Sequence, residues 1–139
     1  MKITTHTVEA TRALGASLAG KARPGDCLVL EGELGAGKTE FVRGFMAALS
    51  GDVAVRSPSF SILNIYDTPR LTVYHFDFYR LVDAAELVEI GFEDCASSDG
   101  VCLIEWGTLF PDALPQHAVI IRFRDRGDGV REVDLGEAA

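Results

Sequence analysis

The eight residues from Gly32 to Thr39, GELGAGKT, constrain the fold of this chain more than any other feature. They match the pattern G-x-x-x-x-G-K-[ST], in which glycines let successive backbone N–H groups turn inward around phosphate oxygens. A short apolar run, Cys27 to Leu30, precedes the loop, and a helix is predicted from about Lys38 to Leu49. That helix would point the positive end of its dipole at the same anion. The spacing therefore predicts a nucleotide-binding loop between a buried strand and a helix.

The ligand expected at this loop is ATP with Mg²⁺. At average composition the pattern arises by chance in about 4 × 10⁻⁵ of windows, or roughly once in two hundred chains of this length. Lys38 is spaced to reach the β- and γ-phosphates, and the Thr39 hydroxyl to ligate Mg²⁺. The guanine-reading motif N-K-x-D is absent from the sequence, which argues against a GTPase.

Two acidic residues that end apolar runs are the expected complement to Thr39. Asp77 follows Val73 to Phe76, and Glu105 follows Val101 to Ile104. Mg²⁺ needs only one or two protein ligands beside phosphates and water. One carboxylate would hold the metal while the other orients the attacking water. The structural alternative is a solvated carboxylate at the end of a strand.

The rest of the chain alternates helical and strand patterns. A helix is predicted over residues 7–22, and the capping box of residues 83–86 predicts another that Gly91 ends. Two hairpins are predicted, over residues 61–77 and 119–135. We therefore expect all 139 residues to form a single α/β domain with a mixed sheet and added antiparallel hairpins.

Composition and charge narrow the classes of protein to which this chain can belong. Its net charge of −8, from 13 basic and 21 acidic residues, disfavours a domain that grips a nucleic-acid backbone unaided. No apolar run approaches the roughly 20 residues of a membrane span, and the first ten residues do not resemble a signal peptide. A cytoplasmic protein without a membrane partner is expected. The three cysteines show no C-x-x-C spacing, so we expect buried or inert thiols.

Several motifs occur together with the loop in a specific order. They are S-P-S-F at Ser57 to Phe60, H-F-D-F-Y-R at His75 to Arg80, and E-W at Glu105 and Trp106, with G-V-R near the end at Gly129 to Arg131. In this combination the chain resembles, from about residue 11 to 135, the TsaE (YjeE-like) family of small bacterial ATPases. Ser59 departs from the family's usual threonine and keeps its hydroxyl.

The resemblance implies a P-loop NTPase-like fold, and an ATP-hydrolysing subunit of the bacterial tRNA threonylcarbamoyladenosine (t6A) system. Its partners would be the TsaB and TsaD proteins, with tRNA reached only indirectly through the assembly and ATPase activity weak without them. Thr39 and Glu105 would then hold Mg²⁺, Asp77 and Lys38 would act in catalysis, and Ser57 to Phe60 would form a switch-like loop. The implied nucleotide-binding residues are Thr11, Glu33, Leu34, Gly35, Ala36, Gly37, Lys38, Thr39, Glu40 and Ser59.

Two other functions stay open at this point: a small-molecule P-loop kinase and a non-hydrolysing nucleotide-binding subunit. Single residues also have two interpretations. Trp106 is a ligand or partner contact or a half-buried structural residue, His75 is structural or catalytic, and Arg80 forms an ion pair or acts at the γ-phosphate. The arginines at 122, 124 and 126 share one strand face, as either an exposed edge or a tRNA or partner patch.

Overall fold

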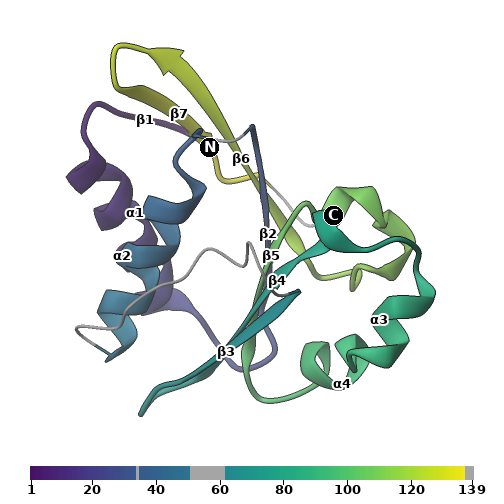
Figure 1. Cartoon of the computed structure of the whole chain (residues 1–139). Helices are drawn as coiled ribbons and strands as arrows, with labels where there is room; N and C mark the ends of the chain where they lie inside the picture. Colours follow the sequence, from purple (N-terminus) through teal and green to yellow (C-terminus); the bar gives the residue numbers. More distant parts are fainter. Residues whose placement is uncertain (34, 51–61, 137–139) are drawn as a thin grey trace.

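The computed structural model describes residues 1–33, 35–50 and 62–136, which build a seven-stranded sheet with helices on both faces (Figure 1). The first half contains β1 (Lys2–Thr5), α1 (Val8–Lys21), β2 (Cys27–Glu31), α2 (Lys38–Ser50), β3 (Leu63–Asp67) and β4 (Thr72–Asp77). The second half contains the 3-10 turn η1 (Phe78–Arg80), α3 (Ala85–Glu89), α4 (Phe92–Ala96), β5 (Val101–Glu105), the turns η2 (Gly107–Leu109) and η3 (Pro111–Ala113), β6 (Val119–Gly127) and β7 (Val130–Asp134).

The strands are ordered β1-β7-β6-β2-β5-β4-β3 across the sheet. Its centre is parallel, because β2 pairs with both β5 and β6, and β5 pairs with β4. The hairpins β3–β4 and β6–β7 extend it antiparallel on either side. The prediction of an α/β fold with a mixed sheet and two added hairpins is confirmed. Strand β1, which pairs with β7, was not predicted, because its four residues are too few to show a period.

Helices α1 and α2 cover one face of the sheet, and α3 and α4 cover the other (Figure 1). The alternation of side chains along β5 divides its residues between the two cores. Leu103 packs in the core beneath α1 and α2, whereas Cys102 and Ile104 pack in the core beneath α3 and α4. All five residues of β5 are buried, as a continuous apolar run predicts for a central parallel strand.

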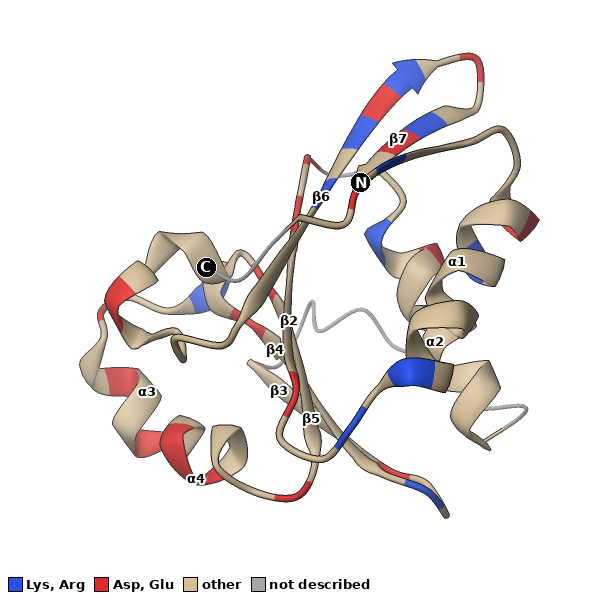
Figure 2. Cartoon of the chain, turned by 180° about the vertical axis from the view of Figure 1, so that it is seen from behind, with Lys and Arg blue, Asp and Glu red and all other residues tan. Residues whose placement is uncertain are grey.

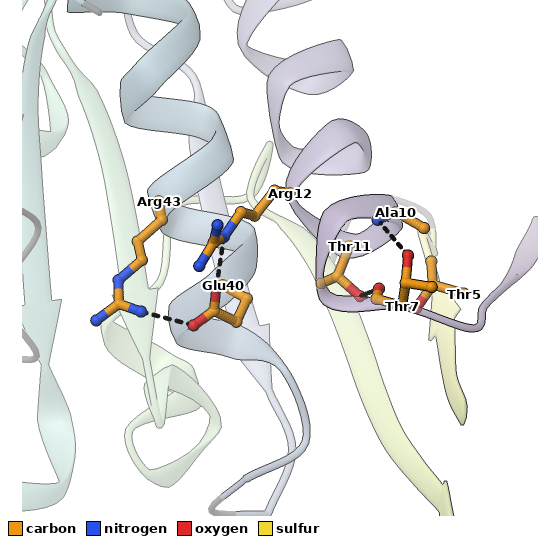
Figure 3. A network of polar contacts seen from close by, with 7 residues as sticks. All are labelled: Thr5, Thr7, Ala10, Thr11, Arg12, Glu40 and Arg43. Carbon is orange, nitrogen blue, oxygen red and sulfur yellow. Dashed lines mark hydrogen bonds and ion pairs between the residues drawn. The ribbon is translucent and has the colours of Figure 1, made fainter. Parts of the chain in front are cut away.

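Helices α1 and α2 approach each other closely because each has a glycine at the contact. A Cβ built on Gly15 would lie 2.0 Å from the carbonyl oxygen of Phe41, and one built on Gly44 would lie 1.8 Å from that of Arg12. Arg12 of α1 forms an ion pair with Glu40 of α2 across this contact, and Arg43 binds the same carboxylate from within α2 (Figure 3). This packing sets the position of the first turn of α2, where the glycine loop ends.

Two elements differ from the predictions in detail. Helix α3 runs from Ala85 to Glu89, and Gly91, with a φ of 73°, separates it from α4. The predicted helix therefore exists but is short, and the predicted capping box is not formed: Ala84 is the N-cap residue, without a side-chain cap, and the Asp83 carboxylate accepts from the N–H of Ala85 at 2.9 Å. The prediction of an exposed edge at the arginines is wrong, since β6 lies inside the sheet between β2 and β7.

Charged side chains are distributed unevenly between helices α3 and α4 and the β6–β7 hairpin (Figure 2). Helices α3 and α4 carry acidic residues and no basic ones, whereas arginines alternate with acidic residues on β6 and β7. Arg122, Arg124 and Arg126 are exposed on one face of β6. Two of them form ion pairs, Arg122 with Glu31 and Arg126 with Glu132. None of the described helices is both long enough and apolar enough to span a bilayer.

Candidate functional site

The glycine loop joins the end of β2 to the start of α2, as the sequence predicts. Its backbone turns through conformations that favour glycine, with φ of 83° at Gly35 and 108° at Gly37. Gly32 passes close to β6, where an added Cβ would lie 2.6 Å from the carbonyl oxygen of Phe123. Side chains at these positions would strain or fill the loop, so the glycines shape a concave backbone at the positive end of α2. Leu34 lies outside the described residues.

Lys38, the first residue of α2, turns back over this loop. Its side chain is only 6% exposed, and its Nζ donates a 2.6 Å hydrogen bond to the carbonyl oxygen of Gly32. The ammonium also lies 4.5 Å from the centre of the Trp106 ring. Burial lowers the pKa of Lys38, while the carboxylates of Glu105 and Asp77 oppose that change. The lysine is therefore held as a buried cation directly beside the loop.

Asp77 and Glu105 lie side by side, because β4 and β5 are parallel and these two residues are register partners. Burial raises the pKa of Asp77, and the neighbouring charge of Glu105 adds to the rise. A hydrogen bond from the backbone N–H of Tyr79 to Asp77 Oδ1, 3.0 Å long, works against it. The two predicted carboxylates are thus brought together at the carboxyl ends of neighbouring strands, facing the loop.

The carboxylate of Glu105 has a different neighbour at each oxygen. Oε2 lies 2.7 Å from Nε2 of His75, and Oε1 lies 4.0 Å from Nζ of Lys38. Glu105 is 9% exposed and His75 is 1% exposed. Of the two interpretations of His75, a structural contact to the predicted metal ligand agrees with this arrangement.

These groups line one pocket of about 820 Å³, a volume in the range of small-molecule sites. The predicted residues that line it are Thr11, Glu33, Gly35, Gly37, Lys38, Thr39, Glu40, Asp77 and Glu105. Ala36 does not line the pocket, because its side chain is 1% exposed and packs in the core under α1 and α2. Ser59 and the whole predicted switch loop, Ser57 to Phe60, lie outside the described residues.

Two of the predicted nucleotide contacts already have side-chain partners. The Thr11 hydroxyl is 2.8 Å from that of Thr5, inside the first turn of α1 (Figure 3). The Glu40 carboxylate is bound by Arg12 and Arg43, each at 2.6 Å. The Thr11 hydroxyl and the Glu40 carboxylate are therefore already hydrogen-bonded. A ligand would contact the backbone or the carbon atoms of these two residues.

The pocket also has walls that the sequence patterns did not identify. His6, Thr7 and Val8 come from the start of α1, and Gly129 and Arg131 come from the β6–β7 hairpin. The signal for Arg131 was its place in the terminal G-V-R motif, but no local pattern shows that β7 returns beside the loop. Its guanidinium is paired with Asp125 at 3.0 Å, and its Cγ would lie 3.7 Å from a Cβ on Gly37.

Two residues with two interpretations, Arg80 and Trp106, also line the pocket, together with Tyr79. The Tyr79 and Trp106 rings lie 5.2 Å apart between centroids, so the half-buried Trp106 packs against Tyr79 and also lines the pocket. Arg80 is exposed and forms no ion pair within 4.0 Å among the described residues. A structural ion pair for Arg80 is therefore not found in this part of the chain.

The described residues contain no group of three or more His, Cys, Asp or Glu side chains that would hold a metal by themselves. Such a group is not required for Mg²⁺, which takes one or two protein oxygens. Cys27 and Cys102 are buried, and burial raises the pKa of Cys27 to about 12. The half-buried Cys95 also has a raised pKa because of burial. The prediction of buried thiols is confirmed for Cys27 and Cys102, and the inertness of the thiols stays a prediction.

Known proteins resemble this chain over most of its length. The family model described as "Threonylcarbamoyl adenosine biosynthesis protein TsaE" matches residues 5–133. The TsaE proteins of Bacillus subtilis and Treponema pallidum, both named as tRNA threonylcarbamoyladenosine biosynthesis proteins, are 41% and 37% identical to this chain. Those alignments cover 96% and 97% of this chain, and 83% and 99% of the relatives.

The crystal structure of Bacillus subtilis YdiB superposes on this fold with a TM-score of 0.85 and 36% sequence identity. It covers all of this chain and 86% of that one. The similarity in sequence and in structure thus extends over nearly the whole length of the chain. The chain belongs to the TsaE family.

Proposed function

We propose that this protein binds ATP with Mg²⁺ and hydrolyses it as a subunit of the t6A modification system of tRNA. The observation that carries the proposal is that one pocket gathers the glycine loop, Lys38, Thr39, Asp77 and Glu105. A phosphate cradle, a buried cation, a hydroxyl and two carboxylates are the set of groups that phosphoryl transfer to water needs. The relatives are named for tRNA threonylcarbamoyladenosine biosynthesis, and this supports the choice of pathway.

The triphosphate would lie against the loop backbone, in front of the first turn of α2. Lys38 is the residue that has to change partner, because its Nζ donates to the carbonyl oxygen of Gly32 in this structure. A phosphate oxygen offers a charged acceptor in place of that neutral carbonyl, and charge-assisted hydrogen bonds are the stronger kind. The Lys38 side chain thus lies within reach of a bound phosphate, and no helix has to move for Nζ to change partner.

Thr39 and Glu105 are the residues that would hold Mg²⁺. Both line the pocket, and a hydroxyl and a carboxylate are hard oxygen donors of the kind Mg²⁺ prefers. The bound ion would neutralise charge on the β- and γ-phosphate oxygens. Asp77, on the neighbouring strand, would accept a hydrogen bond from the attacking water and orient it towards the γ-phosphate.

The proposed partners are the TsaB and TsaD proteins, with tRNA contacted through the assembly. The charge of −8 and the acidic helices α3 and α4 support this division of labour, since they disfavour direct grip on an RNA backbone. Tyr79 is 66% exposed at the pocket, where a docking protein would exclude water from the reacting groups. We therefore propose weak ATPase activity alone, higher activity with partners, and a cytoplasmic location.

The test measures steady-state phosphate release by the protein alone and with TsaB and TsaD, beside multiple-turnover tRNA modification. Both partners are expected to raise the ATPase rate. Lys38→Ala should weaken ATP binding in calorimetry by about 2–4 kcal/mol, because the buried phosphate contact is lost, and should abolish repeated modification. Lys21→Ala, the same charge change at the exposed end of α1, is the matched control.

Equal ATPase rates with and without partners, together with modification unaffected by Lys38→Ala, would overturn the proposal. Transfer of the γ-phosphate to a metabolite instead of water would identify a small-molecule kinase. Tight ATP binding without phosphate release in any mixture would identify a nucleotide-binding subunit that does not hydrolyse.

A further inference from the structure

One buried titratable group, His75, takes no part in the function proposed above. It lies on β4, on the same face as Asp77 two residues later, and it packs diagonally against Glu105 on β5. The residue is 1% exposed and is not part of the pocket lining. On its other side the Tyr66 ring lies 6.4 Å away between ring centres. His75 therefore cannot touch a ligand directly, and any effect it has must pass through Glu105.

The hydrogen-bond pattern assigns the proton on the ring. Nε2 lies 2.7 Å from Oε2 of Glu105, and an ionised carboxylate can only accept, so Nε2 is the donor. Nδ1 is buried and has no hydrogen-bond partner among the described residues. The arrangement therefore indicates that Nε2 carries a proton and donates it to Oε2 of Glu105.

This contact orients the carboxylate. With Oε2 occupied by His75, Oε1 is the oxygen that faces Lys38, 4.0 Å away, on the pocket side. Rotation of the Glu105 side chain would break a hydrogen bond in a site where water cannot replace it. Oε2 of Glu105 is thus held by the hydrogen bond to His75, and Oε1 faces the pocket.

We propose that His75 is a positioning residue, which fixes the Glu105 carboxylate so that Oε1 is directed to the Mg²⁺ that accompanies the nucleotide. The proposal rests on the function proposed above, because it takes Glu105 as a metal ligand. Partners that hydrogen-bond to metal-ligating carboxylates commonly set metal affinity, and their loss costs about 10- to 100-fold. His75 accordingly acts on metal affinity and not on the reacting atoms.

The test compares two substitutions that place an amide N–H at different ring positions. His75→Gln extends its amide to the position of Nε2, whereas His75→Asn places it near Nδ1, out of reach of Glu105. Binding of a non-hydrolysable ATP analogue is measured by calorimetry over a range of Mg²⁺ concentrations. His75→Asn is expected to raise the half-maximal Mg²⁺ concentration about 10-fold or more, and His75→Gln to stay close to the wild type.

Val73→Ala is the matched control, because Val73 is fully buried on the same strand and faces the same core. It should lower thermal stability and leave the Mg²⁺ dependence unchanged. Equal Mg²⁺ dependence in wild type, Asn and Gln variants would overturn the role of His75. Absence of any ATP-analogue binding by the wild type would instead overturn the proposed function, so the two failures are distinguishable.

A measurement on the wild type keeps the proposal testable if a variant does not fold. Nitrogen-15 NMR of the imidazole is expected to show a proton on Nε2, both before and after addition of the ATP analogue with Mg²⁺. A ring protonated at Nδ1 alone would overturn the proposal, since Nε2 would then have no hydrogen to donate to Glu105.

Discussion

At the scale of single residues, the site places two carboxylates with different surroundings next to each other. Glu105 is anchored by His75 and faces Lys38, whereas Asp77 accepts a backbone N–H and is partly open to the pocket. Under the proposed function these environments would separate two roles, with the anchored group holding the metal and the freer group orienting a water. A substitution at Asp77 tests this separation in both activity and stability.

Asp77→Asn should remove hydrolysis while it stabilises the free protein. Asparagine keeps an oxygen acceptor for the N–H of Tyr79, so ATP binding should change little. Loss of the charge that orients water should lower the hydrolysis rate with partners by about 10²-fold or more. Phosphate release and calorimetry on the same samples check both parts, and lost binding with normal hydrolysis would mean that the two carboxylates have exchanged roles.

The stability effect of the same substitution depends on pH with a definite sign. Burial and Glu105 raise the pKa of Asp77 in the folded protein, so the folded chain holds this proton to higher pH than the unfolded chain. The free energy of unfolding therefore falls as pH rises through the window between the unfolded and folded pKa values. Asp77→Asn should melt at a higher temperature than wild type at pH 7, and the difference should vanish in acid, below both pKa values.

At the scale of elements, the site depends on the close contact between α1 and α2. The glycines at this contact allow the α2 backbone to approach α1, and α2 begins at Lys38 of the loop. A wider separation would move both Thr11, on the pocket side of α1, and the first turn of α2. The position of the glycine loop is therefore set by helix packing as well as by the loop's own backbone.

Gly44→Ala should destabilise the protein even though alanine is the better helix former. The added Cβ would lie 1.8 Å from the Arg12 carbonyl oxygen, and backbone atoms cannot move aside without separating the helices. We expect a net loss of about 1–3 kcal/mol in the free energy of unfolding, measured by urea denaturation. Gly20→Ala is the control: nothing lies within 4 Å of its Cβ, so helix propensity should stabilise it by up to about 1 kcal/mol. Equal stabilities for the two variants would contradict the close contact.

At the scale of the whole molecule, the pocket connects distant parts of the sheet. Its walls come from α1, the loop, the ends of β4 and β5, and the β6–β7 hairpin. Residues from His6 to Arg131 therefore line one pocket. A nucleotide bound there would contact all of these elements, so binding should stabilise the fold as a unit.

ATP with Mg²⁺ should raise the melting temperature of the isolated protein. A ligand at 100 times its dissociation constant adds about 2.7 kcal/mol to the stability of the folded state. For a domain of this size that corresponds to roughly 5–10 °C. Lys38→Ala at the same ligand concentration should show only a small fraction of the shift in a thermal melt. An undiminished shift in that variant would place the ligand elsewhere on the protein.

The sequence by itself determined the features that depend on local spacing. The glycine loop, the helix after it, the buried run before Glu105 and both hairpins were predictable, because turn residues and hydrophobic periods act over a few neighbouring residues. The acidic ends of two apolar runs identified Asp77 and Glu105 for the same reason. Strand β1 escaped prediction because four residues carry too little pattern.

Only the tertiary structure decided which of these features meet. The His75–Glu105 contact joins residues 30 positions apart, and it exists because β4 and β5 pair in one particular register. Arg131 reaches the loop because β7 folds back beside β6, which pairs with β2, where the loop begins. Sheet order and register follow from burial summed over the whole chain, so no local pattern contains them. Short sequence motifs supply the chemical groups of the site, and the packing of the complete sheet sets their geometry.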